Sequence, residues 1–416
     1  MNKTLRLLTV GGVLAVVAAA CLASFVSGLW WIVVAALAVV PPGVYLWWRA
    51  GRKQRPAAHP KRGAAAHAAN PTPPRPEQVP ETRKRVYDEN DPNALAQRML
   101  DEGRYALLLR PQIAANLPKH QRQAAIRALD DSMGIVPEGD VLLQSWRHGS
   151  DRDDADSHRE RLVHVEAMYL DRFPATNRQF QQFVDDGGYA NMPLWDSTIW
   201  PAVLDFVDQT GHPGPRFWRD GHFPEGHGDH PVVGVSWYEG AAYARWCGKR
   251  LPSDPEWVKA GCWPVLTQGT RPMQRRYPWG DTMDRELANL WGSGPGATVS
   301  VYELVEGVSV GGIYQLIGNV WEWTTSNFGV WDASARKLET TTPMKSIRGG
   351  AFDTYFETQA TCQFQSGESP ISRKHNIGFR CALALCDVIS TDVDGHAVAD
   401  SEALVACGAE AGEELV

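Results

Sequence analysis

The chain of 416 residues is long enough for two or three domains. Its formal net charge of −7 at pH 7 argues against general nucleic-acid binding, because such proteins carry an excess of basic side chains for the phosphate backbone. Its 17 tryptophans, 38 glycines and 28 prolines are typical of a loop-rich fold whose irregular backbone is held by large aromatic side chains. Seven cysteines are an odd number, so at least one lies outside any intrachain disulfide.

The N-terminal part of the chain is strongly apolar. Residues 7–48 contain no charged side chain, and this stretch is roughly twice the length of about 20 residues that one spanning helix needs. A Ser-Gly pair at 27–28 marks a turn near its middle. We therefore predict two transmembrane helices within residues 1–48, at about 7–26 and 29–48, that form a hairpin.

Basic residues flank this hairpin on both sides. Lys3 and Arg6 precede it, and a basic, acid-free segment follows at 49–62. The positive-inside rule then places the rest of the chain on the cytoplasmic side of the inner membrane. Two alternatives remain open, namely a signal peptide that ends near Cys21 and one long helix that exports the domain to the periplasm.

The remaining sequence divides by composition into four segments. Residues 49–90 form a linker rich in Pro, Ala and basic side chains, which we expect to lie against anionic lipid headgroups of the bilayer. Residues 91–133 are predicted to form a short helical neck, and residues 134–386 the main domain. Residues 387–416 are acidic and rich in small side chains, so we expect a disordered tail.

Several elements can be placed in chain order. The neck is predicted to begin at Asp91-Pro92, where a capping side chain precedes a proline, and to be divided by Pro111 and Pro118. Alternating or apolar runs predict strands at 136–143 and 163–169.

Three helix starts follow in the main domain. Thr176 is expected to cap a helix that presents Phe180 and Phe183 on one face. Ser236 and Ser253 each stand three residues before a glutamate, which is the pattern of a capping box.

The most informative motifs lie near the end of the main domain. They are Gly-Asn-Val-Trp-Glu-Trp-Thr at 318–324, Ile-Arg-Gly-Gly-Ala-Phe at 347–352 and Gly-Phe-Arg-Cys at 378–381. This set resembles the formylglycine-generating enzyme (sulfatase-modifying factor) family. Further motifs match in the expected order at 171–177, 230–237, 248–257, 277–280 and 288–291.

The resemblance implies an α+β fold, the C-type-lectin-like fold of this family, with small twisted sheets and much irregular loop. In such a fold, buried polar side chains satisfy backbone groups that regular ladders would otherwise pair. We interpret the motif residues as structural first. They are Gly318, Asn319, Trp321, Glu322, Trp323, Arg348, Gly349, Gly350, Gly378, Phe379 and Arg380.

The chemistry implied by the resemblance is the oxidation of a substrate cysteine with copper and oxygen, carried by two cysteines. Here the two matching positions are Thr354 and Gln359, and the serine after Gly-Gly is Ala351. Neither replacement supplies the soft thiolate that Cu(I) prefers. Cys362 is the nearest cysteine, but one thiol cannot replace a pair.

The resemblance also suggests structural features. Disulfides of exported relatives correspond to Cys247 with Cys381 and Cys262 with Cys362, which would stay reduced in the cytoplasm. A structural calcium site would use Asn289 and the Leu290 carbonyl, although the loops around it lack the usual acidic residues.

Histidines offer another ligand set. His212, His222, His227 and His230 lie in a Gly- and Pro-rich segment whose spacing does not suit one helix face, so we favour a solvated loop over a metal site. The iron enzymes of the ergothioneine pathway share the lectin-like domain but add a helical bundle with three histidines. The predicted neck contains only His120, which argues against that function.

The leading hypothesis is a membrane-anchored, non-catalytic member of the family that binds or assembles proteins, with no nucleic-acid partner. The expected recognition face lies between residues 351 and 373. Its candidate residues are Asp353, Thr354, Tyr355, Phe356, Gln359, Cys362, Phe364, Arg373 and His375. The alternative is a metal-dependent oxygenase or oxidase whose ligands come from Cys362, His375 and the histidines at 212–230.

Overall fold

The computed structural model describes residues 87–88, 90–144, 160–263, 266–268, 271–331, 337–338, 342–388, 390–391 and 397–398. These residues belong to one compact unit, 70–416. Within this described part of the chain, no helix combines the length and apolar character needed to cross a bilayer. The predicted transmembrane hairpin, nearly all of the predicted linker and most of the predicted acidic tail lie outside the described residues.

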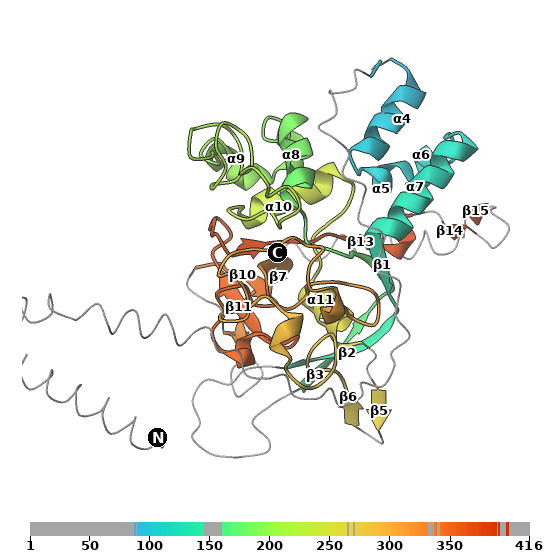
Figure 1. Ribbon diagram of the computed structural model, residues 1–416. Helices are drawn as coiled ribbons and strands as arrows, with labels where there is room; N and C mark the ends of the chain where they lie inside the picture. The colour runs from blue at the N-terminus through green and yellow to red at the C-terminus, as the bar shows by residue number, and fades with distance from the viewer. Residues whose placement is uncertain are drawn as a thin grey trace, which may run out of the picture. The chain divides into compact units, whose positions relative to one another are not determined.

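The predicted neck is helical. It contains α4 (Pro92–Asp101), α5 (Tyr105–Leu108), α6 (Pro111–Ala114) and α7 (Lys119–Ser132). Asp91 caps α4 by accepting a hydrogen bond from the Asn93 amide, while Pro111 begins α6 and Pro118 precedes α7. The start of the neck and its division by prolines are therefore confirmed. Figure 1 shows these helices grouped together, in blue and teal, with α7 next to β1.

The strands form several small sheets. The strands that lie in sheets of three or more are β1 (Met133–Val136), β4 (Met168–Asp171), β7 (Trp321–Asn327), β10 (Lys345–Arg348), β11 (Gln365–Glu368), β12 (Ile377–Gly378) and β13 (Ala382–Ala384). Their orders are β1-β4-β13 and β11-β10-β7-β12, with the β7–β12 pair parallel and the others antiparallel. The three diagnostic motifs thus contribute neighbouring strands to one four-stranded sheet.

The other strands form two-stranded pairs. They are β2 (Gly139–Gln144) with β3 (Glu160–Val165), β5 (Leu266–Gln268) with β6 (Arg271–Met273), β8 (Val330–Trp331) with β9 (Lys337–Leu338), and β14 (Ser390–Thr391) with β15 (Ala397–Val398). The strand predicted at 163–169 is wrong as a single element, because it is interrupted after Val165 and its halves join different sheets. The strand predicted at 136–143 is similarly interrupted between β1 and β2 by Pro137, which has no amide to donate.

Four α-helices belong to the main domain. They are α8 (Asn177–Asp185), α9 (Trp200–Val203), α10 (Trp237–Trp246) and α11 (Asp254–Cys262). Capping boxes start α8 at Thr176, α10 at Ser236 and α11 at Ser253, so the three predicted helix starts are confirmed. Short 3₁₀ turns occupy Met192–Leu194, Ser197–Ile199, Arg285–Leu287, Val305–Gly307, Glu357–Gln359 and Leu385–Asp387.

The neck shares a hydrophobic core with the main domain. Tyr105 and Leu108 of α5 are buried in one cluster with Met133 of β1 and Leu383 of β13. Burial raises the pKa of Tyr105 to about 12, although its neighbour Lys249 opposes this shift. The neck is therefore packed as part of the domain.

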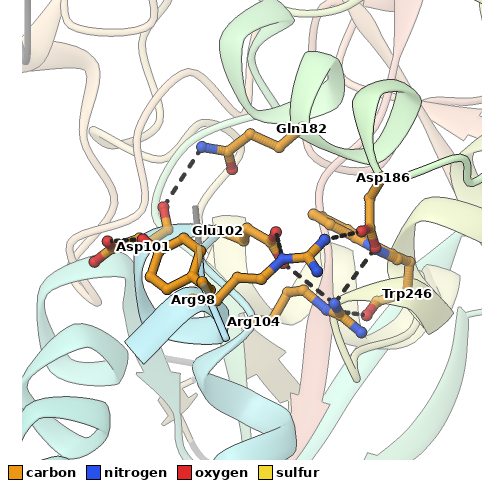
Figure 2. A network of polar contacts seen from close by, with 8 residues as sticks. Arg98, Asp101, Glu102, Arg104, Gln182, Asp186 and Trp246 are labelled. Carbon is orange, nitrogen blue, oxygen red and sulfur yellow. Dashed lines mark hydrogen bonds and ion pairs between the residues drawn. The ribbon is translucent and has the colours of Figure 1, made fainter. Parts of the chain in front are cut away.

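A polar network also joins the helices of the neck to the main domain. Arg98 of α4 pairs with Asp186 at the end of α8, and Asp186 also accepts from the Trp246 indole at 2.7 Å (Figure 2). Arg104 donates to the Trp246 carbonyl at 3.1 Å and lies 3.5 Å from Asp186. This network joins α4 to both α8 and α10.

One ion pair stands at the centre of the main domain. Glu322 and Arg380 are fully buried and form two hydrogen bonds of 2.7 Å. Glu322 also accepts from the Trp257 indole at 2.7 Å. Arg380 donates further to the carbonyls of Asp171 and Tyr314, at 3.0 and 2.9 Å. This pair connects β7 to α11, to β4 and to the chain before β7.

Replacing Glu322 tests how much the stability of the fold depends on this ion pair. We expect Glu322→Gln to lower the free energy of unfolding by about 3–5 kcal/mol, because Arg380 would keep its buried charge without a counterion. Urea denaturation at neutral pH measures this change. The control is Arg178→Gln, which removes an exposed pair with Asp229 and should cost less than about 1 kcal/mol. Similar losses in both variants would contradict this account.

Candidate functional site

The loop between β10 and β11 carries the two positions where the resemblance expects cysteines. Its backbone turns at Gly349, where φ is +96° and a side chain would lie 2.4 Å from the Leu316 carbonyl. Thr354 is buried, and its hydroxyl accepts a hydrogen bond from the Ala351 amide at 2.8 Å. Gln359 ends a short 3₁₀ turn. The residues present do not fit a copper site, because neither position offers sulfur.

Cys362 does not compensate for the missing pair. It is fully buried beside Cys262, and burial together with the hydrogen bond between the two thiols raises its pKa well above the usual range. A buried neutral thiol is a poor metal ligand.

The two cysteine pairs suggested by the resemblance are each in contact. Cys247 lies within hydrogen-bonding reach of Cys381, and Cys262 lies within reach of Cys362. All four are buried free thiols, whereas Cys386 is exposed. The geometry therefore matches both pairings in the reduced form.

An exposed group of aromatic side chains lies next to Thr354. Trp291, Tyr355 and Phe356 have 54%, 63% and 60% of their surface exposed. The rings of Tyr355 and Phe356 are 5.1 Å apart at 88°, and those of Trp291 and Tyr355 are 6.4 Å apart at 57°. We call these three residues the aromatic face. The Trp291 amide donates to the Thr354 carbonyl at 3.3 Å, so two loops support the face together.

An ion pair borders this face. Arg285 lies 2.8 Å from Glu357 and also donates to the Trp291 carbonyl at 3.0 Å. Trp291 was not among the residues predicted for recognition, because it precedes the expected segment by about 60 positions. In the sequence, the family motif at 288–291 was the one signal that included Trp291.

Two predicted recognition residues lie inside the fold instead. Phe364 is half-buried with its ring 6.0 Å from Trp321. Arg373 is nearly buried, pairs with Glu239 at 2.9 Å and donates to the Val207 carbonyl. Their role in recognition stays a prediction, and the structure shows that both side chains also pack against or hydrogen-bond to the fold.

The remaining candidates, Asp353 and His375, lie together. The His375 imidazole is exposed and its Nε2 is 3.7 Å from Asp353, too far for a hydrogen bond. Asn376 donates to both carboxylate oxygens of Asp353, at 3.1 and 3.0 Å. The His375 ring also neighbours Phe352 and Phe217. Among the described residues, the contacts of His375 are therefore with a carboxylate and two aromatic rings.

Asp208 organises the loop that receives Arg373. Its carboxylate accepts hydrogen bonds from the amides of Thr210, His212 and Gly221 at 2.7, 3.1 and 2.8 Å. Burial alone would raise the pKa of Asp208, but these hydrogen bonds lower it to about 2. The loop is therefore held by an ionised carboxylate.

The diagnostic motif residues occupy structural positions. Asn319 adopts a left-handed conformation with φ of +66°. Its side-chain oxygen accepts hydrogen bonds from the Asn289 side-chain amide and from the Val299 backbone amide. Arg348 pairs with buried Asp254 at 2.8 Å. The other motif side chains lie in the same buried region, namely Trp321, Trp323 and Phe379, with Gly318, Gly350 and Gly378 in the connecting backbone.

The residues expected to hold calcium do not form a cation cage. The Leu290 carbonyl already accepts hydrogen bonds from Ser293 and Gly294. Oδ1 of Asn289 has no hydrogen-bond partner among the described residues, but Gly294 packs directly against it. One free neutral oxygen falls short of the six to eight that calcium prefers.

The ligand set considered for an oxygenase is not assembled. Cys362 is enclosed beside Cys262, while His375 is exposed beside Asp353. The His227 and His230 rings are 4.5 Å apart, and His230 bonds to Thr298. In the described ranges, only Glu138, His164 and Glu166 bring three ligand atoms within 4.8 Å of one another.

These features define an α+β domain of small sheets, with buried ion pairs at its centre and an exposed aromatic face above a loop without thiolates. The sequence model of the sulfatase-modifying factor enzyme 1-like domain matches residues 119–385, more than half of the chain. The chain belongs to this formylglycine-generating enzyme family, and the resemblance seen in the sequence is confirmed.

Individual relatives are similar over parts of the chain. Hercynine oxygenase from Mycobacterium tuberculosis is 39% identical over 180 residues, which cover 41% of this chain and 40% of that protein. Inactive C-alpha-formylglycine-generating enzyme 2 from Bos taurus is 31% identical, with 53% of this chain and 79% of that protein covered. The solved structure of CarF has a TM-score of 0.41 and 19% identity, over 61% of this chain and 98% of that chain.

Oxidation should test the cysteine contacts. We expect mild oxidation of purified protein to link Cys247 to Cys381 and Cys262 to Cys362, because each pair of thiols is already in contact. Peptide mapping by mass spectrometry without reduction measures these links. As a control, exposed Cys386 should react first with a maleimide in the native protein. Links between members of different pairs would contradict the structure.

Asp208 should contribute a pH-dependent term to stability. Its pKa in the folded protein, about 2, lies below the ordinary value of 3.8, so its stabilising effect is present above pH 4 and is lost as the pH falls through 2. We expect Asp208→Asn to be less stable at pH 6 by about 1–3 kcal/mol, with the difference shrinking toward pH 2. Urea denaturation across this range measures it, and a constant difference would contradict the assignment.

Proposed function

We propose that this protein is a non-catalytic member of its family that binds a protein partner through the aromatic face. The observation that carries the proposal is the coincidence of two features in one loop. Thr354 and Gln359 stand where copper-binding cysteines would be needed, and Tyr355 and Phe356 project between them. The similarity to a relative that is itself named inactive supports a non-catalytic role.

The chemistry of the face suits a protein surface. Exposed Trp and Tyr side chains are the usual anchors of protein interfaces, because they bury a large area with little loss of conformational freedom. The three rings meet at steep angles and form an uneven surface, which favours contact with apolar side chains over stacking against a flat ring. The Arg285–Glu357 pair supplies a polar rim.

We further propose that the protein is anchored in the inner membrane with this domain in the cytoplasm. The apolar segment at 7–48 and the basic residues on both sides support this topology. A reporter fused to the C-terminus tests the topology, and alkaline phosphatase activity there would place the domain in the periplasm instead.

A metal-dependent oxygenase is the second candidate. The 39% identity to hercynine oxygenase favours it, although this chain spans 40% of that protein. Metal analysis of the purified protein separates the two functions. Stoichiometric copper or iron that is lost when Cys362 or His375 is replaced would overturn the non-catalytic function.

Site-specific photocrosslinking tests the aromatic face directly. With p-benzoylphenylalanine in place of Tyr355, we expect a crosslink to one discrete protein in cells, and Trp291→Ala should reduce its yield at least tenfold. The matched control places the same group at Leu204, which is 79% exposed and lies outside the face. Equal yields at both positions, or conversion of a sulfatase-derived cysteine peptide to its aldehyde, would contradict the proposal.

A further inference from the structure

Four polar side chains share one face of the β2–β3 hairpin. Asp140 and His164 are directly opposite each other in the antiparallel register. Glu138 comes directly before β2 and Glu166 directly after β3, and both carboxylates lie beside the His164 imidazole. The register therefore gathers three carboxylates around one imidazole.

The distances within this group are close to those of a coordination shell. His164 Nε2 is 3.5 Å from Glu138 Oε1 and 3.6 Å from Glu166 Oε1. A tetrahedral ion with bonds of 2.0–2.2 Å holds its ligands about 3.4 Å apart. All three ligand atoms lie within 4.8 Å of one another. An ion would therefore need only small side-chain adjustments.

Asp140 prepares the imidazole for this role. Its carboxylate lies 2.9 Å from His164 Nδ1. A carboxylate that accepts from Nδ1–H orients the ring, as the outer-shell partners of metal-binding histidines do, and a bound ion would take the place of a proton on Nε2 between the two glutamates. The imidazole is thus oriented with Nε2 toward Glu138 and Glu166.

The local charge also favours a divalent ion. Lys259 lies buried beneath the hairpin, and its ammonium donates to the Gly139 carbonyl at 2.5 Å. This single ammonium does not balance the three carboxylates. The hydrogen bond to Asp140, together with the neighbouring glutamates, raises the pKa of the His164 imidazole, so a divalent ion would bind there by displacing the Nε2 proton. Exposed carboxylates held this close repel one another unless a cation lies between them.

From these contacts we propose that Glu138, His164 and Glu166 form a divalent-cation site, with Asp140 as the residue that positions His164. One imidazole nitrogen and two carboxylate oxygens suit a borderline ion such as Zn²⁺ better than Ca²⁺ or Mg²⁺. The exposed position leaves a fourth site to water. Glu138 precedes β2 and Glu166 follows β3, so a bound ion ties together the end of the hairpin that leads to β1 and β4.

The test is metal titration of the full chain after metal removal. We expect one equivalent of Zn²⁺ by calorimetry at pH 7.5, and visible d–d absorption of a four-coordinate ion when Co²⁺ is used. His164→Ala should abolish both signals, and Asp140→Asn should weaken binding about 10- to 100-fold. Zn²⁺ should also raise the melting temperature of the wild type and leave that of His164→Ala unchanged.

A second histidine provides the matched control. His222 is exposed in the segment at 211–230, so His222→Ala should bind Zn²⁺ like the wild type. Binding that survives His164→Ala but is lost in His222→Ala would overturn the proposal in favour of the other histidines. Absence of Zn²⁺ binding to the wild type would also overturn it and would leave an exposed cluster of ion pairs.

Discussion

The buried pair of Glu322 and Arg380 is the constraint on which the rest of this fold depends. Both charged groups are buried away from water. Each therefore needs the other as a counterion, and each needs hydrogen-bond partners for its remaining donors or acceptors. Arg380 meets this need by donating to the backbone carbonyls of Asp171 and Tyr314, and Glu322 by accepting from Trp257. Short sheets leave many carbonyls outside regular ladders, and a guanidinium with five donors can satisfy several of them at once. The pairs Arg348–Asp254 and Arg373–Glu239 repeat this solution in neighbouring regions.

These buried pairs also determine what is displayed at the surface. Arg348 is fixed by Asp254 at the end of β10, directly before the tight turn at Gly349. In the loop that follows, the Thr354 hydroxyl accepts a hydrogen bond from the Ala351 amide and stabilises a turn. Tyr355 and Phe356 come directly after this turn and are exposed. The aromatic face is therefore presented by a rigid base, which under the proposed function would reduce the conformational entropy lost when a partner binds.

Local signals in the sequence were sufficient for some of these features and not for others. The capping boxes at Ser236 and Ser253 are encoded within four residues, and the structure contains both. The break after Val165 depends on which sheet each half joins, and that is decided by partners far away in the chain. For the same reason Arg373 looked like a surface residue, since its partners Glu239 and Val207 are more than 130 positions away. Trp291 lies in the aromatic face because its amide donates to the Thr354 carbonyl, and this contact between distant loops has no signal in the local sequence.

The fold is compatible with the absence of cysteine at positions 354 and 359, because the fold and a metal-binding pair depend on different atoms. A pair of metal-binding thiolates is built to hold an ion, whereas the fold rests on buried pairs that none of the replaced positions touches. Thr354 even adds a hydrogen bond within the turn, so a hydroxyl at this position supports the loop that displays the aromatic face. The proposed binding function would require the ion pairs and the turn, and it would not require thiolates at Thr354 and Gln359.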